Sequence, residues 1–186
     1  MPTPAPAIRA RLALVALFAL AMAGTRMSHF GSAALLPDAS LAVFFLGGAL
    51  LRRWSYCAGL FLLAFGLDFF YAAGALERAW CLSPSYWGLV PGYGALWLTG
   101  RMLAARGDAY PLVPSLAWAI GGVSGAFLVS NLTWYWAGDP AGVAGFGAFW
   151  LAVARYYPPY LGSALVYLLP AWAGYRLARL RAPQTN

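Results

Sequence analysis

The sequence predicts an all-α integral membrane protein, a single domain in which six transmembrane helices form a bundle. Three observations carry this prediction. The 186 residues are 62% hydrophobic and 9% charged, whereas a soluble domain carries about 25% charged residues. The apolar residues form long runs, and a helix needs about 20 of them to cross a bilayer. All 12 basic residues are arginine, and most of them lie at one set of ends of these runs.

The predicted spans follow one another with short connections. They cover residues 9–27, 33–51, 56–75, 86–104, 112–136 and 158–180. The first span also resembles a cleaved signal peptide that ends near Ala21-Met22-Ala23. Cleavage would leave five spans and send one terminus outward, against the distribution of the arginines. We therefore expect this segment to be retained as a helix of the bundle.

The second span is irregular, because Gly31, Ser32, Pro37 and Asp38 interrupt it before a clean apolar run begins near Leu41. Two interpretations fit this pattern. A broken helix is tolerated in a membrane where it lines a cavity, and such segments often mark the binding site of a transporter. Alternatively, the helix simply begins late, after a surface loop.

The third to sixth spans are more regular. The third, 56–75, contains a carboxylate at Asp68, and the sixth, 158–180, has arginines at its end. Between the fifth and sixth spans, residues 138–158 contain several glycines and then Phe149, Trp150 and Leu151. We expect an outer loop with a short helix, which is either a lid or a segment of the aromatic belt at the membrane interface.

The arginines predict the orientation of the bundle, because a positive excess marks the cytoplasmic side of a membrane protein. The arginines at one set of span ends are Arg9, Arg11, Arg52, Arg53, Arg101, Arg106, Arg176, Arg179 and Arg181. Arg26, Arg78 and Arg155 fall at the opposite ends. We predict that both termini lie in the cytoplasm, with the protein in the inner membrane of a bacterium and in contact with anionic lipid.

Composition also excludes several classes of function. The net charge of +7 comes from arginines that occur singly or in pairs, so it forms no continuous basic face for nucleic acid. Without lysine the chain has neither a nucleotide-binding GxxxxGK[ST] loop nor a Schiff-base lysine. One histidine excludes an HExxH zinc site, and the two cysteines form no CxxC motif.

Polar and aromatic residues gather at the predicted outer end, and Cys81 stands out among them. Trp80 can shield it from water, and Arg78 would favour its thiolate form, which binds metals and attacks electrophiles. The two cysteines, Cys57 and Cys81, bracket the third span, about 30 Å apart along a helix, which is too far for a disulfide. The alternative for Cys81 is an inert small residue packed in a loop.

Two titratable residues join Cys81 as candidates. His29 titrates near neutrality and is able to ligate a metal, bind a ligand amide or cap a helix. Asp68 lies inside a predicted span, where burial of a charged carboxylate costs free energy. Such a carboxylate faces either a cavity or a partner residue. The alternative for Asp68 is a structural bond to Arg26, Arg78 or a tyrosine hydroxyl.

Four stretches of the chain resemble one family of transporters. They are His29-Phe30-Gly31, Pro37 to Leu41, Leu67 to Phe70, and Trp80 to Trp87. Together with the six spans, the small size and the outer cysteine, they look like the BtuM-type cobalamin transporters. That family is similar to the substrate-binding S-components of energy-coupling-factor (ECF) transporters. The resemblance covers most of the chain, and the loop cysteine is its sharpest marker.

The resemblance implies a site and a mechanism. By this resemblance, Cys81 corresponds to an axial ligand of the cobalt in a base-off cobalamin. The resemblance also implies that Cys81 assists the decyanation of cyanocobalamin. His29, Asp68 and Tyr86 would line the corrin pocket, and Trp80, Tyr135 and Tyr157 would stack on the ring or cover it. A soft thiolate is a sensible ligand for such a metal.

The resemblance also bears on partners, and two other functions stay open. S-components dock on an ECF transmembrane and ATPase module, whereas BtuM-type members are thought able to act alone. Ala19 and Ala23 permit close approach of a partner helix in the first span. The alternatives are an S-component for another vitamin and a small membrane enzyme that uses Cys81 as nucleophile with His29 as base.

Overall fold

A computed structural model describes residues 5–26, 36–73, 84–107, 109–137 and 145–181. Within these ranges the chain is all-α, with seven α-helices and one 3-10 helix, η2. The elements are α1 (Ala5–Thr25), α2 (Ser40–Leu50), α3 (Trp54–Ala73), η2 (Pro84–Gly88), α4 (Leu89–Ala104), α5 (Leu112–Ala137), α6 (Phe146–Ala154) and α7 (Tyr157–Arg181).

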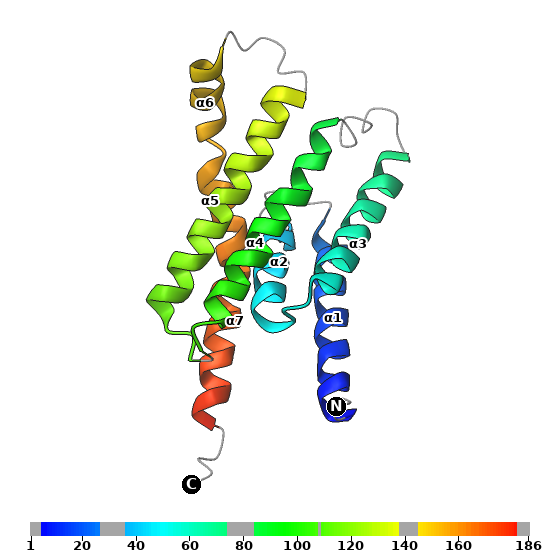
Figure 1. Ribbon diagram of the computed structural model, residues 1–186, viewed down its shortest axis with the longest axis vertical. Helices are drawn as coiled ribbons and strands as arrows, with labels where there is room; N and C mark the ends of the chain where they lie inside the picture. The colour runs from blue at the N-terminus through cyan, green and yellow to red at the C-terminus, as the bar shows by residue number, and fades with distance from the viewer. Residues whose placement is uncertain (1–4, 27–35, 74–83, 108, 138–144, 182–186) are drawn as a thin grey trace.

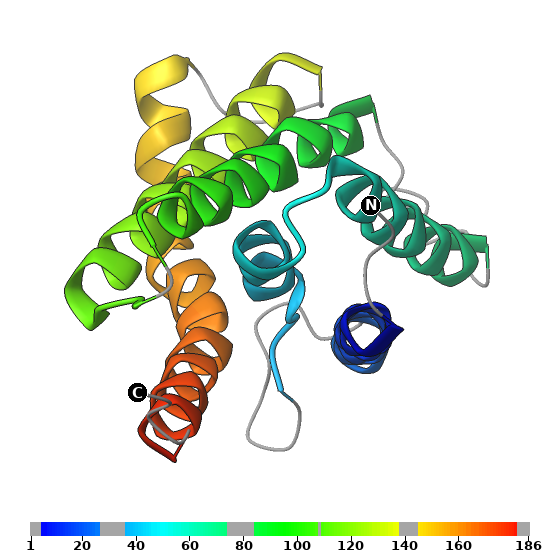
Figure 2. The ribbon, with the colours of Figure 1, turned by 60° about the horizontal axis from the view of Figure 1, so that its bottom comes forward.

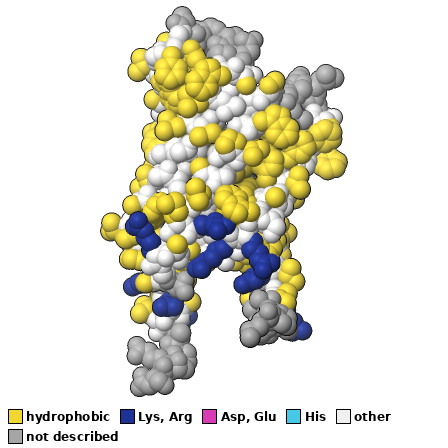
Figure 3. Space-filling model, viewed as in Figure 1, with side chains coloured by type: hydrophobic (Ala, Val, Ile, Leu, Met, Phe, Trp, Pro, Cys, Tyr) yellow, Lys and Arg dark blue, Asp and Glu magenta, His cyan; other side chains and the backbone are white. Residues whose placement is uncertain are grey.

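The long helices run up and down in alternation (Figure 1). The start of α1 and the end of α7 lie at the same end, together with the α2–α3 and α4–α5 connections. We call this the basic end, because arginine side chains gather there, as Figure 3 shows. Its arginines are the nine that the sequence places on the cytoplasmic side. The sequence predicts helices that alternate in direction, with the first beginning and the last ending on the same side. The arrangement of α1 to α7 agrees with this prediction.

Helix α2 lies at the centre of the bundle (Figure 2). It contacts α1, α3, α4, α5 and α7, and nine of its 11 residues are buried. A helix of this length spans about 16 Å, roughly half of the ~30 Å hydrocarbon core. The predicted second span, 33–51, is therefore corrected to a short central helix that begins at Ser40.

The late start of α2 has a local cause. Pro37 cannot donate a backbone hydrogen bond and restricts the residue before it. The carboxylate of Asp38 then accepts the backbone N–H of Ser40 at 2.9 Å, which is the residue where the helix begins. Residues 36–39 are non-helical and α2 begins at Ser40, as both interpretations of the sequence allow, and the residues at which the two interpretations differ, 27–35, lie outside the described residues.

Glycines bring α2 and α4 into close contact. A Cβ atom at Gly48 would overlap the backbone carbonyl oxygen of Trp97, and one at Gly100 would overlap that of Phe45. Because these overlaps involve backbone atoms, the two helices cannot keep this spacing with larger residues at either position. Small residues serve the same purpose wherever helices pack closely in membranes.

The face of the bundle in Figure 3 carries hydrophobic side chains over much of its height. Phe70, Leu151 and Leu180 are among the large hydrophobic side chains that are more than three-quarters exposed. Three described helices are long and apolar enough to cross a membrane, within Ile8–Thr25, Trp54–Ala73 and Leu112–Ala137. These features are consistent with a multi-pass membrane protein.

Helix α6 confirms the short helix that the sequence predicts after the fifth span. It does not stand free of the bundle, because its Phe149 is fully buried against α5. The ring of Phe149 lies 5.4 Å from that of Trp134 and 4.9 Å from that of Tyr135. Leu151, on the other side of α6, is 82% exposed.

Candidate functional site

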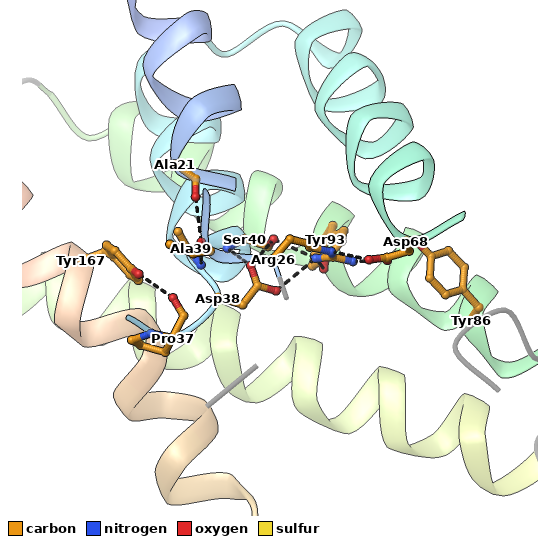
Figure 4. Close-up of polar contacts among 11 residues, drawn as sticks. Ala21, Arg26, Pro37, Asp38, Ala39, Ser40, Asp68, Tyr86, Tyr93 and Tyr167 are labelled. Carbon is orange, nitrogen blue, oxygen red and sulfur yellow. Dashed lines mark hydrogen bonds and ion pairs between the residues drawn. The ribbon is translucent and has the colours of Figure 1, made fainter. Parts of the chain in front are cut away.

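A buried network of charged and polar side chains has Arg26 at its centre (Figure 4). It lies where α1 ends and α2 begins, away from the basic end. Arg26 directly follows α1 and is 3% exposed. Its Nε donates to Asp68 Oδ1 at 2.9 Å, and its Nη2 donates to Asp68 Oδ2 at 2.6 Å. This is the two-pronged geometry in which arginine and carboxylate bind most strongly.

The remaining nitrogen of Arg26 contacts three further groups. Nη1 lies 3.1 Å from Asp38 Oδ2, 2.8 Å from Ser40 Oγ and 2.6 Å from the hydroxyl oxygen of Tyr93. Ser40 Oγ in turn donates to Asp38 Oδ1 at 2.6 Å. A guanidinium carries five N–H donors in a planar fork, and here all three of its nitrogens are engaged.

Tyr86 completes the network from η2. Its hydroxyl donates to Asp68 Oδ2 at 2.8 Å, so this oxygen accepts from both Tyr86 and Arg26. The network therefore joins the end of α1, the start of α2, the outer part of α3, η2 and α4. These five elements are separated in sequence. The hydrogen bonds of Arg26 join four of them, and the bond from Tyr86 to Asp68 adds η2.

Burial explains why these groups are paired. An isolated ion inside a protein is expensive, whereas a paired and hydrogen-bonded one is tolerated. The Asp38 and Asp68 side chains are 15% and 11% exposed, so both carboxylates depend on the positive charge of Arg26. Two carboxylates against one guanidinium leave a net charge of −1 when both are ionised.

Two backbone anchors flank the network. Thr25 Oγ1 accepts the backbone N–H of Ala39 at 2.9 Å, which ties the start of α2 to the end of α1. The Tyr167 hydroxyl of α7 donates to the carbonyl oxygen of Pro37. The non-helical residues before α2 are thus held from both sides.

The predicted site residues Asp68 and Tyr86 lie together in this network. Both are buried, and the hydrogen bonds to Arg26 and between themselves occupy their polar atoms. Of the partners considered for Asp68, Arg26 and a tyrosine hydroxyl bind it, and Arg78 lies outside the described residues. This arrangement favours a positioning role for Asp68 and Tyr86 over direct ligand contact.

Tyr135 and Tyr157 lie in a different cluster, formed by α5, α6 and α7. The Tyr135 ring packs on Phe146 and Phe149. The Tyr157 hydroxyl lies 2.7 Å from Ser124 Oγ, and its ring is 5.3 Å from that of Phe127. These two tyrosines stabilise the packing of α6 and α7 on α5.

The other predicted site residues, His29, Trp80 and Cys81, lie outside the described residues. In sequence, His29 comes three residues after Arg26, and Cys81 comes three residues before Pro84, where η2 begins. The described part of the chain contains no group of three His, Cys, Asp or Glu side chains that would hold a metal ion. Cys57, at the start of α3, is buried.

Sequence reasoning did not single out Asp38, Ser40 and Tyr93 as members of a site. The sequence did contain one indication of this site, since the ionisable residues Arg26 and Asp38 lie at the ends of two consecutive apolar runs. An ionisable residue next to or within a membrane span needs a partner of opposite charge. Tyr93 carries no comparable signal, because a tyrosine in an apolar helix is common.

No protein-family model matches this chain, and no curated protein matches it in sequence.

Proposed function

We propose that this chain binds cobalamin or a related corrinoid and carries it across the inner membrane of a bacterium. In this proposal the chain crosses the membrane six times, and the second crossing combines α2 with the non-helical residues before it. Both termini lie in the cytoplasm, and the binding site opens to the periplasm. The arginines of the basic end support this orientation, because positive residues are retained on the cytoplasmic side. The resemblance of the four sequence stretches to the BtuM-type transporters supports the choice of ligand.

The Arg26 network is the structural observation that carries the proposal. Within it, Arg26 is bonded to Asp38, and these two residues flank residues 27–35, the segment that contains His29. Asp68 of the same network is bonded to Tyr86, which follows residues 74–83, the segment that contains Cys81. The network therefore fixes the flanks of both segments relative to each other, as a site built from His29 and Cys81 requires.

The chemistry assigned to Cys81 is ligation of the substrate's cobalt by its thiolate. Sulfur is a soft, polarisable donor, and the thiolate is the form of cysteine that binds metals. Binding on the lower face would displace the nucleotide base and leave the cobalamin base-off. A strongly donating thiolate on one axial face weakens the bond to cyanide on the other, so cyanide leaves with its electron pair and water replaces it.

The test is the visible absorption spectrum of the purified full-length protein after incubation with hydroxocobalamin and gel filtration. Wild-type protein is expected to retain the cobalamin and to show a spectrum that differs from that of the free compound. Cys81→Ser is expected to lose this difference, because a hydroxyl is a poor ligand for this metal.

Cys57→Ser is the matched control, since it removes the other cysteine of the chain. It should leave the bound spectrum unchanged. A wild-type spectrum in Cys81→Ser would contradict thiolate ligation. If the wild-type protein retains no cobalamin at all, the corrinoid proposal fails, and an S-component for another vitamin becomes the better description.

The same protein tests the need for a partner. An ECF module with ATPases would be required if uptake in cells fails without one, whereas uptake by this chain expressed alone would show that it acts independently. The alternative of a membrane enzyme with a Cys81 nucleophile and a His29 base depends on two residues that lie outside the described residues. Hydrolysis of a lipid or thioester that Cys81→Ser abolishes would support that alternative instead.

A further inference from the structure

An apolar groove runs along the central helix between α1, α5 and α7. It encloses about 320 Å³, and nearly all the side chains that line it are aliphatic or aromatic. Its rim includes Leu17 of α1, Leu50 of α2 and Leu169 of α7, which are all exposed. The groove is therefore open at the side of the bundle, where a membrane protein meets lipid.

A second, polar pocket of about 630 Å³ continues the groove at the basic end. The two share four lining residues, Ala49, Leu50, Tyr110 and Tyr175. Four arginines also line the polar pocket, namely Arg11, Arg52, Arg53 and Arg179. They come from α1, from the α2–α3 connection and from α7, so three separate parts of the chain converge on it.

The arginines that line this pocket outnumber the acidic residues of the segments that form it. The residues that line it include no carboxylate. The described acidic residues, Asp38 and Asp68, are both bound to Arg26 at the other end of the bundle. Asp108 is the acidic residue of the α4–α5 connection and lies outside the described residues. One carboxylate does not balance four arginines, so the pocket attracts anions.

Backbone conformation adds a second observation at the same place. Among the described residues, the non-glycine positions with positive φ are Arg52, at 64°, and Tyr110, at 40°. Both line the polar pocket. At Arg52 the left-handed conformation ends α2, because the backbone N–H of Arg52 donates to the carbonyl oxygen of Gly47 at 3.2 Å. The chain therefore turns sharply at the polar pocket, which places Arg52 and Arg53 in its lining.

Ser115 provides a third observation in the groove itself. Its Oγ is buried and has no hydrogen-bond partner among the described residues. A buried hydroxyl without a partner calls for one from outside the chain, such as a ligand or water. Ser115 lies near the start of α5, close in sequence to Tyr110, where the groove meets the polar pocket.

We infer that the basic end binds an anionic phospholipid, with its phosphate at Arg11, Arg52, Arg53 and Arg179 and one acyl chain in the groove. The dimensions agree with one leaflet. The groove follows α2 from Ala42 to Leu50, and the whole helix is about 16 Å long, close to half of a ~30 Å hydrocarbon core. Arginine is suited to phosphate, because its planar fork donates two parallel hydrogen bonds.

Charge and shape together select this ligand over others. A soluble anion would need only the arginines and would leave the apolar groove without an occupant. A neutral lipid would fill the groove but would not balance the excess positive charge of the polar pocket. The ester oxygens of a phospholipid, between its phosphate and its chains, would lie at the level where Ser115 has a hydroxyl to donate.

The experiment is native mass spectrometry of the full-length protein in detergent, with added phosphatidylglycerol or phosphatidylcholine of identical chains. Wild-type protein is expected to retain one phosphatidylglycerol at least tenfold more tightly than phosphatidylcholine. The pocket variant Arg11→Gln/Arg179→Gln is expected to lose at least tenfold in affinity for phosphatidylglycerol. Ala171→Trp, which fills the groove from an exposed position on α7, should weaken phosphatidylglycerol binding as well.

The matched control is Arg9→Gln/Arg176→Gln, which removes two arginines from the same two helices outside the pocket. It should bind phosphatidylglycerol like the wild type. Equal losses in the two double variants would overturn the proposal, because they would indicate only a diffuse attraction to the basic end. Equal retention of phosphatidylcholine, or displacement of phosphatidylglycerol by millimolar inorganic phosphate alone, would also overturn it.

Discussion

The two ends of the bundle use the same residue type in opposite ways. At one end, Arg26 is buried and bonded to carboxylates and hydroxyls of four residues, which lie in α3, in α4 and at the start of α2. At the basic end, arginines contact backbone carbonyls and the faces of aromatic rings. Arg101 donates to the carbonyl oxygen of Arg52 at 2.7 Å and lies 5.6 Å from the centre of the Trp54 ring. Arg106 lies 4.9 Å from the ring of Trp118.

This difference shows what decides the role of an arginine at the end of an apolar helix. Where carboxylates from neighbouring helices converge on it, the arginine becomes part of the core and holds those helices together. Where no carboxylate among the described residues faces it, the arginine stays at the surface, and its charge is directed toward the lipid headgroups. We expect the two environments to respond very differently to substitution.

The largest effect is expected from Arg26→Met. The change leaves Asp38 and Asp68 buried without their cation, and removing one partner of a buried ion pair costs roughly 3–5 kcal/mol. The free energy of unfolding is measured by denaturant titration in detergent, followed by circular dichroism. Arg106→Met at the basic end is the matched control, and an equal loss in both variants would contradict the comparison.

A compensated variant sharpens this result. Replacing the ions by apolar residues in Arg26→Met/Asp38→Ala/Asp68→Leu removes the uncompensated charges, and such replacements are often neutral or stabilising. We expect most of the lost stability to return. If retention of hydroxocobalamin does not return with it, the network positions the site and does not merely support the fold.

A smaller effect is expected from Asp68→Asn, about 2 kcal/mol, because an amide keeps the shape of the side chain but not its charge-assisted bonds. Asp38→Asn should cost less, since Asp38 makes a single contact with the guanidinium at 3.1 Å whereas Asp68 makes two shorter ones. The same titration measures both. A larger loss for Asp38→Asn would show that Asp68 is not the principal partner of Arg26.

Tyr86→Phe tests the outermost contact of the network. It removes a hydroxyl that donates to the ionised Asp68, and we expect a loss of about 1–2 kcal/mol. Tyr157→Phe is the matched comparison, since its hydroxyl bonds to the neutral Ser124, and it should cost about 1 kcal/mol or less. Equal unfolding free energies for Tyr86→Phe and the wild type would show that η2 is held by packing alone.

The smallest effect is expected from Arg106→Gln at the basic end. An exposed cation over an aromatic ring contributes about 0.5–1 kcal/mol, so the unfolding free energy should fall by no more than that. The loss should shrink further in high salt, because exposed charges are screened. A loss comparable to that of Arg26→Met would show that the basic end is also part of the structural core.

The sequence by itself determines much of the fold, because hydropathy and breaker residues act locally. The predicted spans 9–27, 56–75 and 112–136 match α1, α3 and α5 within a few residues. The short helix after the fifth span is also present. The location of α2 is the exception, since composition alone does not distinguish a broken crossing from a short helix whose start is set by Pro37 and Asp38.

The candidate site depends on tertiary structure. The sequence indicates that Asp68 needs a partner, but the choice of Arg26, 42 residues away, follows from how α1 and α3 pack. Ser40 and Tyr93 enter the network because α2 and α4 approach closely at Gly48 and Gly100. Composition fixes where each helix lies in the chain. Which polar groups meet is decided by the rotation and height of one helix against another, and these depend on contacts between residues far apart in sequence.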